Sequence, residues 1–136
     1  MSDRKRQALK ECGVDYDEGM EKFMGEEELY DGLLVDFLTE NTFDGAALCL
    51  EKGDEEGFLK AVHAMKSVTG TLSMNRLYRL CFDTVEHLRN GEPEAAKESF
   101  ISAYEEYGQI ACCIRKEIGG RAEEQNVNDQ RGRPVP

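Results

Sequence analysis

At 136 residues, the chain is long enough for one domain with a single hydrophobic core, and its net charge of -11 and pI near 4.7 make it acidic. This charge argues against nucleic acid and anionic membrane surfaces as partners, because both present phosphates that require basic side chains. No apolar run approaches the roughly 20 residues of a membrane span, and the basic start has no apolar signal-peptide core behind it. We therefore expect a cytoplasmic protein.

The first part of the chain predicts short helices. Residues 1–13 form a polar lead-in with one short helix from Asp3 to Cys12, and a second short helix spans Asp15–Met24 and stops at Gly25. Strand signals are nearly missing from the sequence, since it has few β-branched runs and no apolar alternation. The pattern is typical of an all-helical chain.

Longer amphipathic helices are predicted over 26–39, 43–52, 55–72, 74–89 and 94–118. Short polar turns join them, such as the one in which Gly53 ends one helix and Asp54 caps the next. Residues 14–118 therefore predict an all-α, up-and-down antiparallel four-helix bundle, with short N-terminal helices that cap one opening of its core. Residues 119–136 have almost no apolar side chains, and we expect a disordered tail.

The sequence has five cysteines, an odd number, without Cys-x-x-Cys or Cys/His ligand spacing. In a reducing compartment we interpret Cys49, Cys81 and at least one of Cys112 and Cys113 as small core residues. We expect neither a metal site nor a catalytic thiol from them.

The predicted helix over 55–72 has one apolar face, with steps of three and four residues. The residues of this stripe are Phe58, Val62, Met65, Thr69 and Leu72. His63 lies off the stripe, so its ring is predicted to face away from the core.

On the side of His63, the residues one and two turns further on are Lys66, Ser67 and Gly70. A helix selected only for stability would not place Ser and Gly there, since Gly costs about 1 kcal/mol relative to Ala. Small side chains leave the ring uncovered, and Lys66 supplies a positive charge where an anion can sit. We interpret this accessible imidazole as a nucleophile or a phosphate carrier.

A lone histidine in a helical pattern is more often structural or simply exposed. We interpret His87, the second histidine, as such an exposed residue. It lies near a helix end beside Glu86 and close to Arg89, and no small residues follow it at helical spacing within its helix. We expect it to be a solvated surface residue.

The segment from His63 to Ser73 has Lys66 three residues after the histidine, then mostly small residues, and Leu72 near its end. It resembles the motif of the histidine-containing phosphotransfer (HPt) domain of two-component phosphorelays. The resemblance extends over about residues 14–118 and includes the segments Val14–Gly25, Glu51–Asp54 and Leu77–Glu86. Ser67 and Ser73 stand where the family usually has glycine. Ser67 is still small, and we hypothesise that its hydroxyl hydrogen-bonds a phosphoryl oxygen.

The resemblance implies a phosphorelay step in which His63 accepts a phosphoryl group from a receiver-domain phospho-aspartate and passes it to another receiver. Lys66 would stabilise the phosphate charge, and Leu59, Ser67, Gly70 and Arg76 would contact the partner. The implied partners are receiver domains of response regulators or hybrid histidine kinases.

The same resemblance implies that the receiver supplies Mg²⁺, so the chain itself needs no cofactor or metal. The sequence has no P-loop and no glycine-rich nucleotide lid, and we expect a carrier without kinase or hydrolase activity. We expect it to be a monomer.

Several alternatives stay open. The chain is also consistent with a non-catalytic helical scaffold that binds a receiver or another signalling protein without phosphate transfer. A metal-binding carboxylate bundle would need Glu-x-x-His pairs, but Lys60 occupies the position of that Glu before His63. Leu59 either flanks the core or offers an apolar contact beside the ring.

Overall fold

The computed structural model describes residues 3–119, and all its regular elements in this range are helical. They are α1 (Asp3–Glu11), α2 (Tyr16–Lys22), α3 (Glu27–Phe37), α4 (Thr42–Lys52), α5 (Glu55–Thr71), α6 (Asn75–Arg89), α7 (Pro93–Ile114) and a π-helical turn η1 (Arg115–Gly119). The predicted all-α class is confirmed for this part of the chain. The expected disordered tail lies outside the described residues, except for Gly119.

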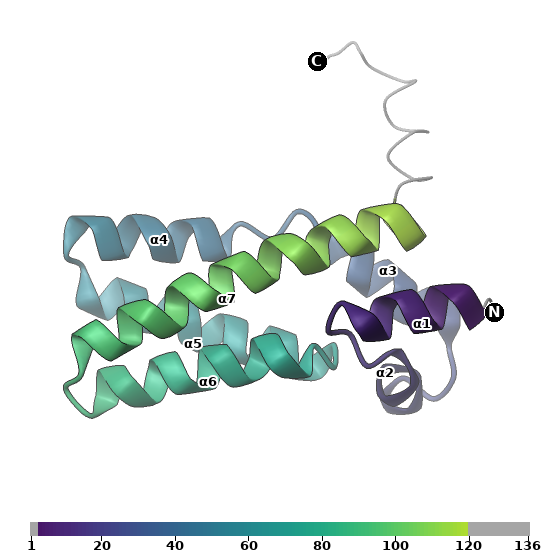
Figure 1. Cartoon of the computed structure of the whole chain (residues 1–136), viewed down its shortest axis with the longest axis horizontal. Coiled ribbons are helices and arrows are strands. Elements are labelled where there is room, and N and C mark those ends of the chain that lie inside the picture. Colours follow the sequence, from purple (N-terminus) through teal and green to yellow (C-terminus); the bar gives the residue numbers. More distant parts are fainter. Residues whose placement is uncertain (1–2, 120–136) are drawn as a thin grey trace, which may run out of the picture.

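Helices α4, α5 and α6 lie side by side in one half of the molecule, and α7 runs along them and continues into the other half, where α1, α2 and α3 gather (Figure 1). Each of α4 to α7 packs against the next helix in the chain, and α1 and α3 pack against α7 and η1. The turns at 53–54, 72–74 and 90–92 are too short for a crossover, so consecutive helices reverse direction.

Local signals explain where α5 and α7 begin and end. The Asp54 carboxylate accepts a hydrogen bond from the Gly57 N–H at 3.0 Å, which satisfies a free donor in the first turn of α5. Pro93 opens α7, where its missing N–H costs nothing. The single helix predicted over 94–118 is α-helical only to Ile114, and the π-helical turn η1 follows it. This turn brings Gly119 close to Leu38: a Cβ on residue 119 would lie 2.8 Å from Leu38 Cδ1.

The stripe of α5 forms the centre of the core. All five of its predicted residues are at most 5% exposed: Phe58, Val62, Met65, Thr69 and Leu72. Aromatic rings fill the space beside it, and Phe100 of α7 meets Phe58 edge-on with ring centroids 5.0 Å apart. Phe43 of α4 stacks on Tyr107 of α7 at 4.7 Å. The rotation of α5 about its axis is therefore set by packing.

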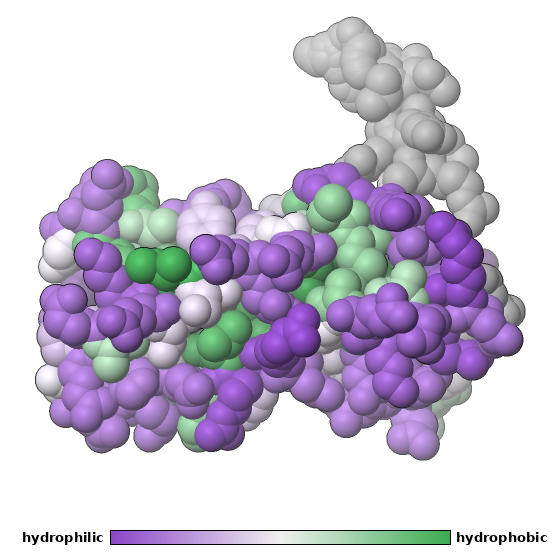
Figure 2. Space-filling model, in the orientation of Figure 1, coloured by the Kyte–Doolittle hydropathy of each residue, from purple (hydrophilic) through white to green (hydrophobic). Residues whose placement is uncertain are grey.

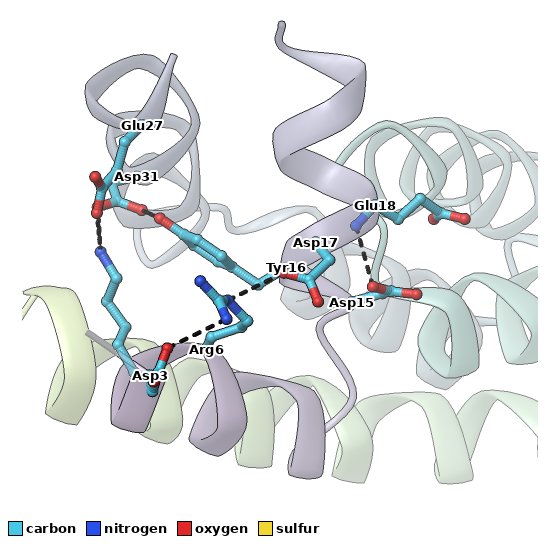
Figure 3. Close-up of polar contacts among 9 residues, drawn as sticks. Asp3, Arg6, Asp15, Tyr16, Asp17, Glu18, Glu27 and Asp31 are labelled. Atoms are coloured by element: carbon cyan, nitrogen blue, oxygen red, sulfur yellow. Dashed lines mark hydrogen bonds and ion pairs between the residues drawn. The ribbon is translucent and has the colours of Figure 1, made fainter. Parts of the chain in front are cut away.

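Polar contacts join α1 to α2 and α3 (Figure 3). Lys5 Nζ donates to Glu27 Oε2 at 2.7 Å and to Asp31 Oδ2 at 2.9 Å, and the Tyr16 hydroxyl donates to Asp31 Oδ1 at 2.6 Å. Leu9 of α1 is fully buried in the common core. The described part of the lead-in, residues 3–13, therefore packs onto the rest of the protein.

Tyr30 of α3 ties the N-terminal helices to the end of α5. Its hydroxyl donates to the Leu72 carbonyl at 2.7 Å, and its ring stacks on Phe23 at 5.4 Å. Gly19 of α2 lies against the same ring, where a Cβ would be 2.1 Å from Tyr30 Cζ. Burial raises the pKa of Tyr30, which keeps the hydroxyl protonated as a donor.

We predict that Gly19→Ala destabilises the protein by about 1–3 kcal/mol, because the added methyl group must displace the Tyr30 ring. Gly32→Ala in α3 is the matched control. Its Cβ would meet nothing within 4 Å, so the alanine is expected to stabilise the helix by about 0.5–1 kcal/mol. Urea unfolding followed by circular dichroism measures both, and equal stability of the two variants would contradict this packing.

Candidate functional site

His63 is exposed midway along α5. Because Val62 and Met65 are buried on the opposite side of the helix, the imidazole is turned away from the core. Its neighbours Ala64 and Ser67 are also exposed. Within residues 3–119, His63 makes no hydrogen bond or ion pair, so its ring nitrogens are open to a partner.

Lys66 lies one turn after His63 and is half-buried. Its ammonium sits over the ring of Phe82 in α6, 5.4 Å from the centroid, and the Arg79 guanidinium lies 5.1 Å from the same centroid. This cation–π contact draws the lysine toward α6 and holds it there. A positive charge is therefore present where α5 faces α6, one helical turn after His63.

Gly70 has a packing role at this surface. A Cβ there would lie 3.1 Å from Tyr78 Cδ1, so the glycine lets the ring of Tyr78 approach α5 closely. The Gly70 carbonyl also accepts a hydrogen bond from Lys22 Nζ of α2 at 2.7 Å. Of the two small residues predicted beside His63, Ser67 is therefore exposed and Gly70 is partly covered by Tyr78.

Two depressions flank Ser67. The first, of about 660 Å³, lies between α2, α5 and α6 and is lined by residues that include Lys22, Phe23, Lys66 and Tyr78. The second, of about 310 Å³, lies between α3 and α5, with an apolar floor and the carboxylates of Asp36 and Glu40. His63 lines neither of them.

Sequence reasoning missed Lys22, Phe23 and Tyr78 as neighbours of Ser67 and Gly70. Lys22 is 48 residues away from Gly70 in the chain, and no local spacing signals such a contact. Only the packing of α2 and α6 against α5 brings these side chains together.

The predicted contact residues Leu59 and Arg76 have different surroundings. Leu59 is half-buried and packs against the core, which favours the interpretation that it flanks the core over the one in which it offers an apolar contact beside the His63 ring. Arg76 donates from Nε and Nη2 to Glu106 Oε2 of α7 at 3.0 and 2.9 Å. Glu106 is only 8% exposed, so Arg76 compensates a buried charge at the α6–α7 contact.

Ser73, at the turn between α5 and α6, has a φ of 61°. This left-handed conformation favours glycine, which is the residue that the HPt-like pattern usually has there. The Ser73 carbonyl accepts a hydrogen bond from the Asp15 N–H at 2.9 Å, so the strained turn is held by the segment that links α1 to α2.

His87 is half-exposed at the end of α6, and its Nδ1 lies 2.7 Å from Glu92 Oε1. One of its ring nitrogens thus already has a carboxylate oxygen as its hydrogen-bonding partner. The two histidines of the sequence therefore differ: His63 has no polar partner among the described residues, and His87 contacts the Glu92 carboxylate.

The comparisons with family models, curated proteins and solved structures found no match to this chain. Between Asp3 and Gly119, no helix is long and apolar enough to cross a membrane. Over the same residues, no three His, Cys, Asp or Glu side chains gather as they would around a metal ion.

We predict that Arg76→Ala destabilises the protein by about 1–3 kcal/mol, because Glu106 is left buried without its counter-charge. Lys60→Ala is the control, since the Lys60–Glu56 pair is exposed and 3.9 Å long and should contribute less than about 0.5 kcal/mol. Thermal unfolding of both variants measures the difference. If Arg76→Ala has the same melting temperature as the wild type, the ion pair with Glu106 does not contribute to stability, and the Arg76 guanidinium is free to bind other partners.

Proposed function

We propose that this chain is a phosphorelay carrier similar to HPt domains and that His63 is its phospho-acceptor. The observation that carries the proposal is the open imidazole midway along α5, opposite a stripe of side chains that are almost fully buried. On this proposal, α4 to α7 are an up-and-down antiparallel four-helix bundle, and α1 to α3 are helices that cover one end of it.

The proposed reaction is a displacement at phosphorus. A lone pair on a ring nitrogen of His63 attacks the phosphoryl group of a receiver's phospho-aspartate, so that an N–P bond forms as the P–O bond to the aspartate breaks. The aspartate leaves as a carboxylate, and the ring keeps its proton on the other nitrogen. A second receiver takes the group by the reverse process.

Such a transfer depends on positioning and charge neutralisation, because the transition state is loose. The buried stripe and aromatic contacts of α5 support precise positioning, since they fix the direction in which His63 points. Lys66 offers the charge, and the small side chains of Ala64 and Ser67 leave room for a receiver to approach. The receiver supplies Mg²⁺ with its own acidic residues.

The proposal makes the chain dependent on other proteins. Its partners are receiver domains of response regulators or hybrid histidine kinases, and it acts as a cytoplasmic monomer without kinase activity of its own. Ser67 and Leu59 are the proposed contact residues nearest the ring, whereas the ion pair of Arg76 with Glu106 supports a structural role.

A helical scaffold that binds without phosphate transfer is the second candidate. It is favoured by the position of the two depressions, which flank Ser67 and leave His63 outside their lining. A scaffold would bind through these depressions, and the imidazole would have no chemical part.

We predict that phosphate moves from a labelled phospho-receiver to the wild-type chain and to His87→Gln, but not to His63→Gln. The two variants form a matched pair, since the sequence has only two histidines. A panel of receiver domains is incubated with each chain, and the label is tested for the acid lability and alkali stability of an N–P bond. Label on His63→Gln would refute the assignment, and binding without label transfer would favour the scaffold.

We also predict that Lys66→Met slows the transfer about tenfold, which corresponds to about 1.4 kcal/mol of transition-state stabilisation. Methionine keeps the apolar stem against Phe82 and removes only the charge. Lys97→Met on α7 removes an exposed charge far along the chain and is expected to leave the rate unchanged. Single-turnover transfer kinetics measures both, and equal rates would remove Lys66 from the proposed site.

A further inference from the structure

The side chains of Cys12 and Cys113 both lie at the end of α1. Cys12 Sγ lies 3.3 Å from the Leu9 carbonyl oxygen, and Cys113 Sγ, in the last turn of α7, lies 3.6 Å from the carbonyl oxygen of the adjacent residue Ala8. The two thiols are close enough to influence each other's acidity. Two residues that are far apart in the sequence thus place their thiols at neighbouring carbonyls of one helix end.

The surroundings of the pair allow access by a small reagent. Both cysteines are half-buried and lie at the edge of the core. In Figure 2, weakly apolar side chains line the surface where the end of α7 meets α1. A peroxide or a small disulfide can approach such a site, whereas it cannot reach a fully enclosed thiol.

The two thiols are unequal in acidity. The interaction with Cys12 lowers the pKa of Cys113, and the same interaction together with burial raises the pKa of Cys12. Cys113 is therefore the thiol of the pair that forms a thiolate more readily. By contrast, burial raises the pKa of Cys81 to about 12, so that thiol is inert.

We propose that Cys12 and Cys113 form a redox-active pair, which peroxides or small disulfides oxidise to an intramolecular disulfide that fastens α1 to α7. With hydrogen peroxide, the Cys113 thiolate attacks the O–O bond and becomes a sulfenic acid, and hydroxide leaves. Cys12 then attacks this sulfur, the S–S bond forms, and water is released. In total, two thiols lose two electrons and two protons, and one peroxide becomes two water molecules.

The disulfide would close a covalent loop over residues 12–113, which contains all of α2 to α6. Such a long loop restricts the unfolded chain strongly, so the oxidised protein should be the more stable form. It would also prevent α1 from separating from α7. The proposal does not depend on the chemistry of His63.

The test compares Cys112→Ser with Cys113→Ser, since the two residues are neighbours and only Cys113 belongs to the pair. The full chain is treated with hydrogen peroxide, and free thiols are counted after denaturation. Two thiols should disappear from the wild type and from Cys112→Ser, whereas Cys113→Ser and Cys12→Ser should form no internal disulfide. Circular dichroism of each variant, with Cys113→Ala as a second substitution, verifies that it is folded.

Peptide mapping without reduction locates the bond. Trypsin releases Cys12 in the peptide Glu11–Lys22 and places Cys112 and Cys113 together in Glu98–Arg115, so the mapping is done in the Cys112→Ser protein. The expected result is one linked peptide pair and a higher melting temperature that dithiothreitol reverses. Retention of all thiols, a bond to Cys49 or Cys81, or a bond between two chains would overturn the proposal.

Discussion

The burial of one face of α5 is the constraint on which the rest of the structure depends. Phe58, Val62 and Met65 are each 1% exposed, and together with Thr69 and Leu72 they fill the centre of the core. A helix with such a stripe cannot rotate without exposing it to water, at a cost of roughly 25 cal/mol for each Å² of apolar surface. The direction of His63 follows from this, because it lies on the opposite side of the same turns.

The second feature that matters for the candidate site is the way in which neighbouring helices cover α5. Tyr30 holds α3 to the carbonyl of Leu72, and Lys22 holds α2 to the carbonyl of Gly70. Tyr78 of α6 also packs on Gly70. These contacts cover the C-terminal part of α5 and leave the turn of His63 to Ser67 open. The exposed imidazole therefore lies on the face of α5 that is turned away from the core, next to the exposed residues Ala64 and Ser67.

Charge is distributed unevenly over this acidic protein. Several cations are held in fixed places: Lys5 joins α1 to α3, Arg76 neutralises Glu106, and Lys66 lies on the ring of Phe82. The first two are structural because their carboxylate partners are partly or largely covered. Lys66 has an aromatic partner instead, which leaves its positive charge uncompensated and suited to an anion.

The sequence by itself determined the helices, their ends to within a few residues, the buried stripe of α5 and the outward direction of His63. These features depend on contacts between residues three and four apart and on caps such as Asp54, which are local. The tertiary structure alone decided which side chains meet across helices. It paired Arg76 with Glu106, placed Lys22 and Tyr78 at Gly70, and brought Cys113 to the end of α1, where Cys12 lies. Such contacts join distant parts of the chain, and the packing of whole helices sets them, so no spacing in the sequence encodes them.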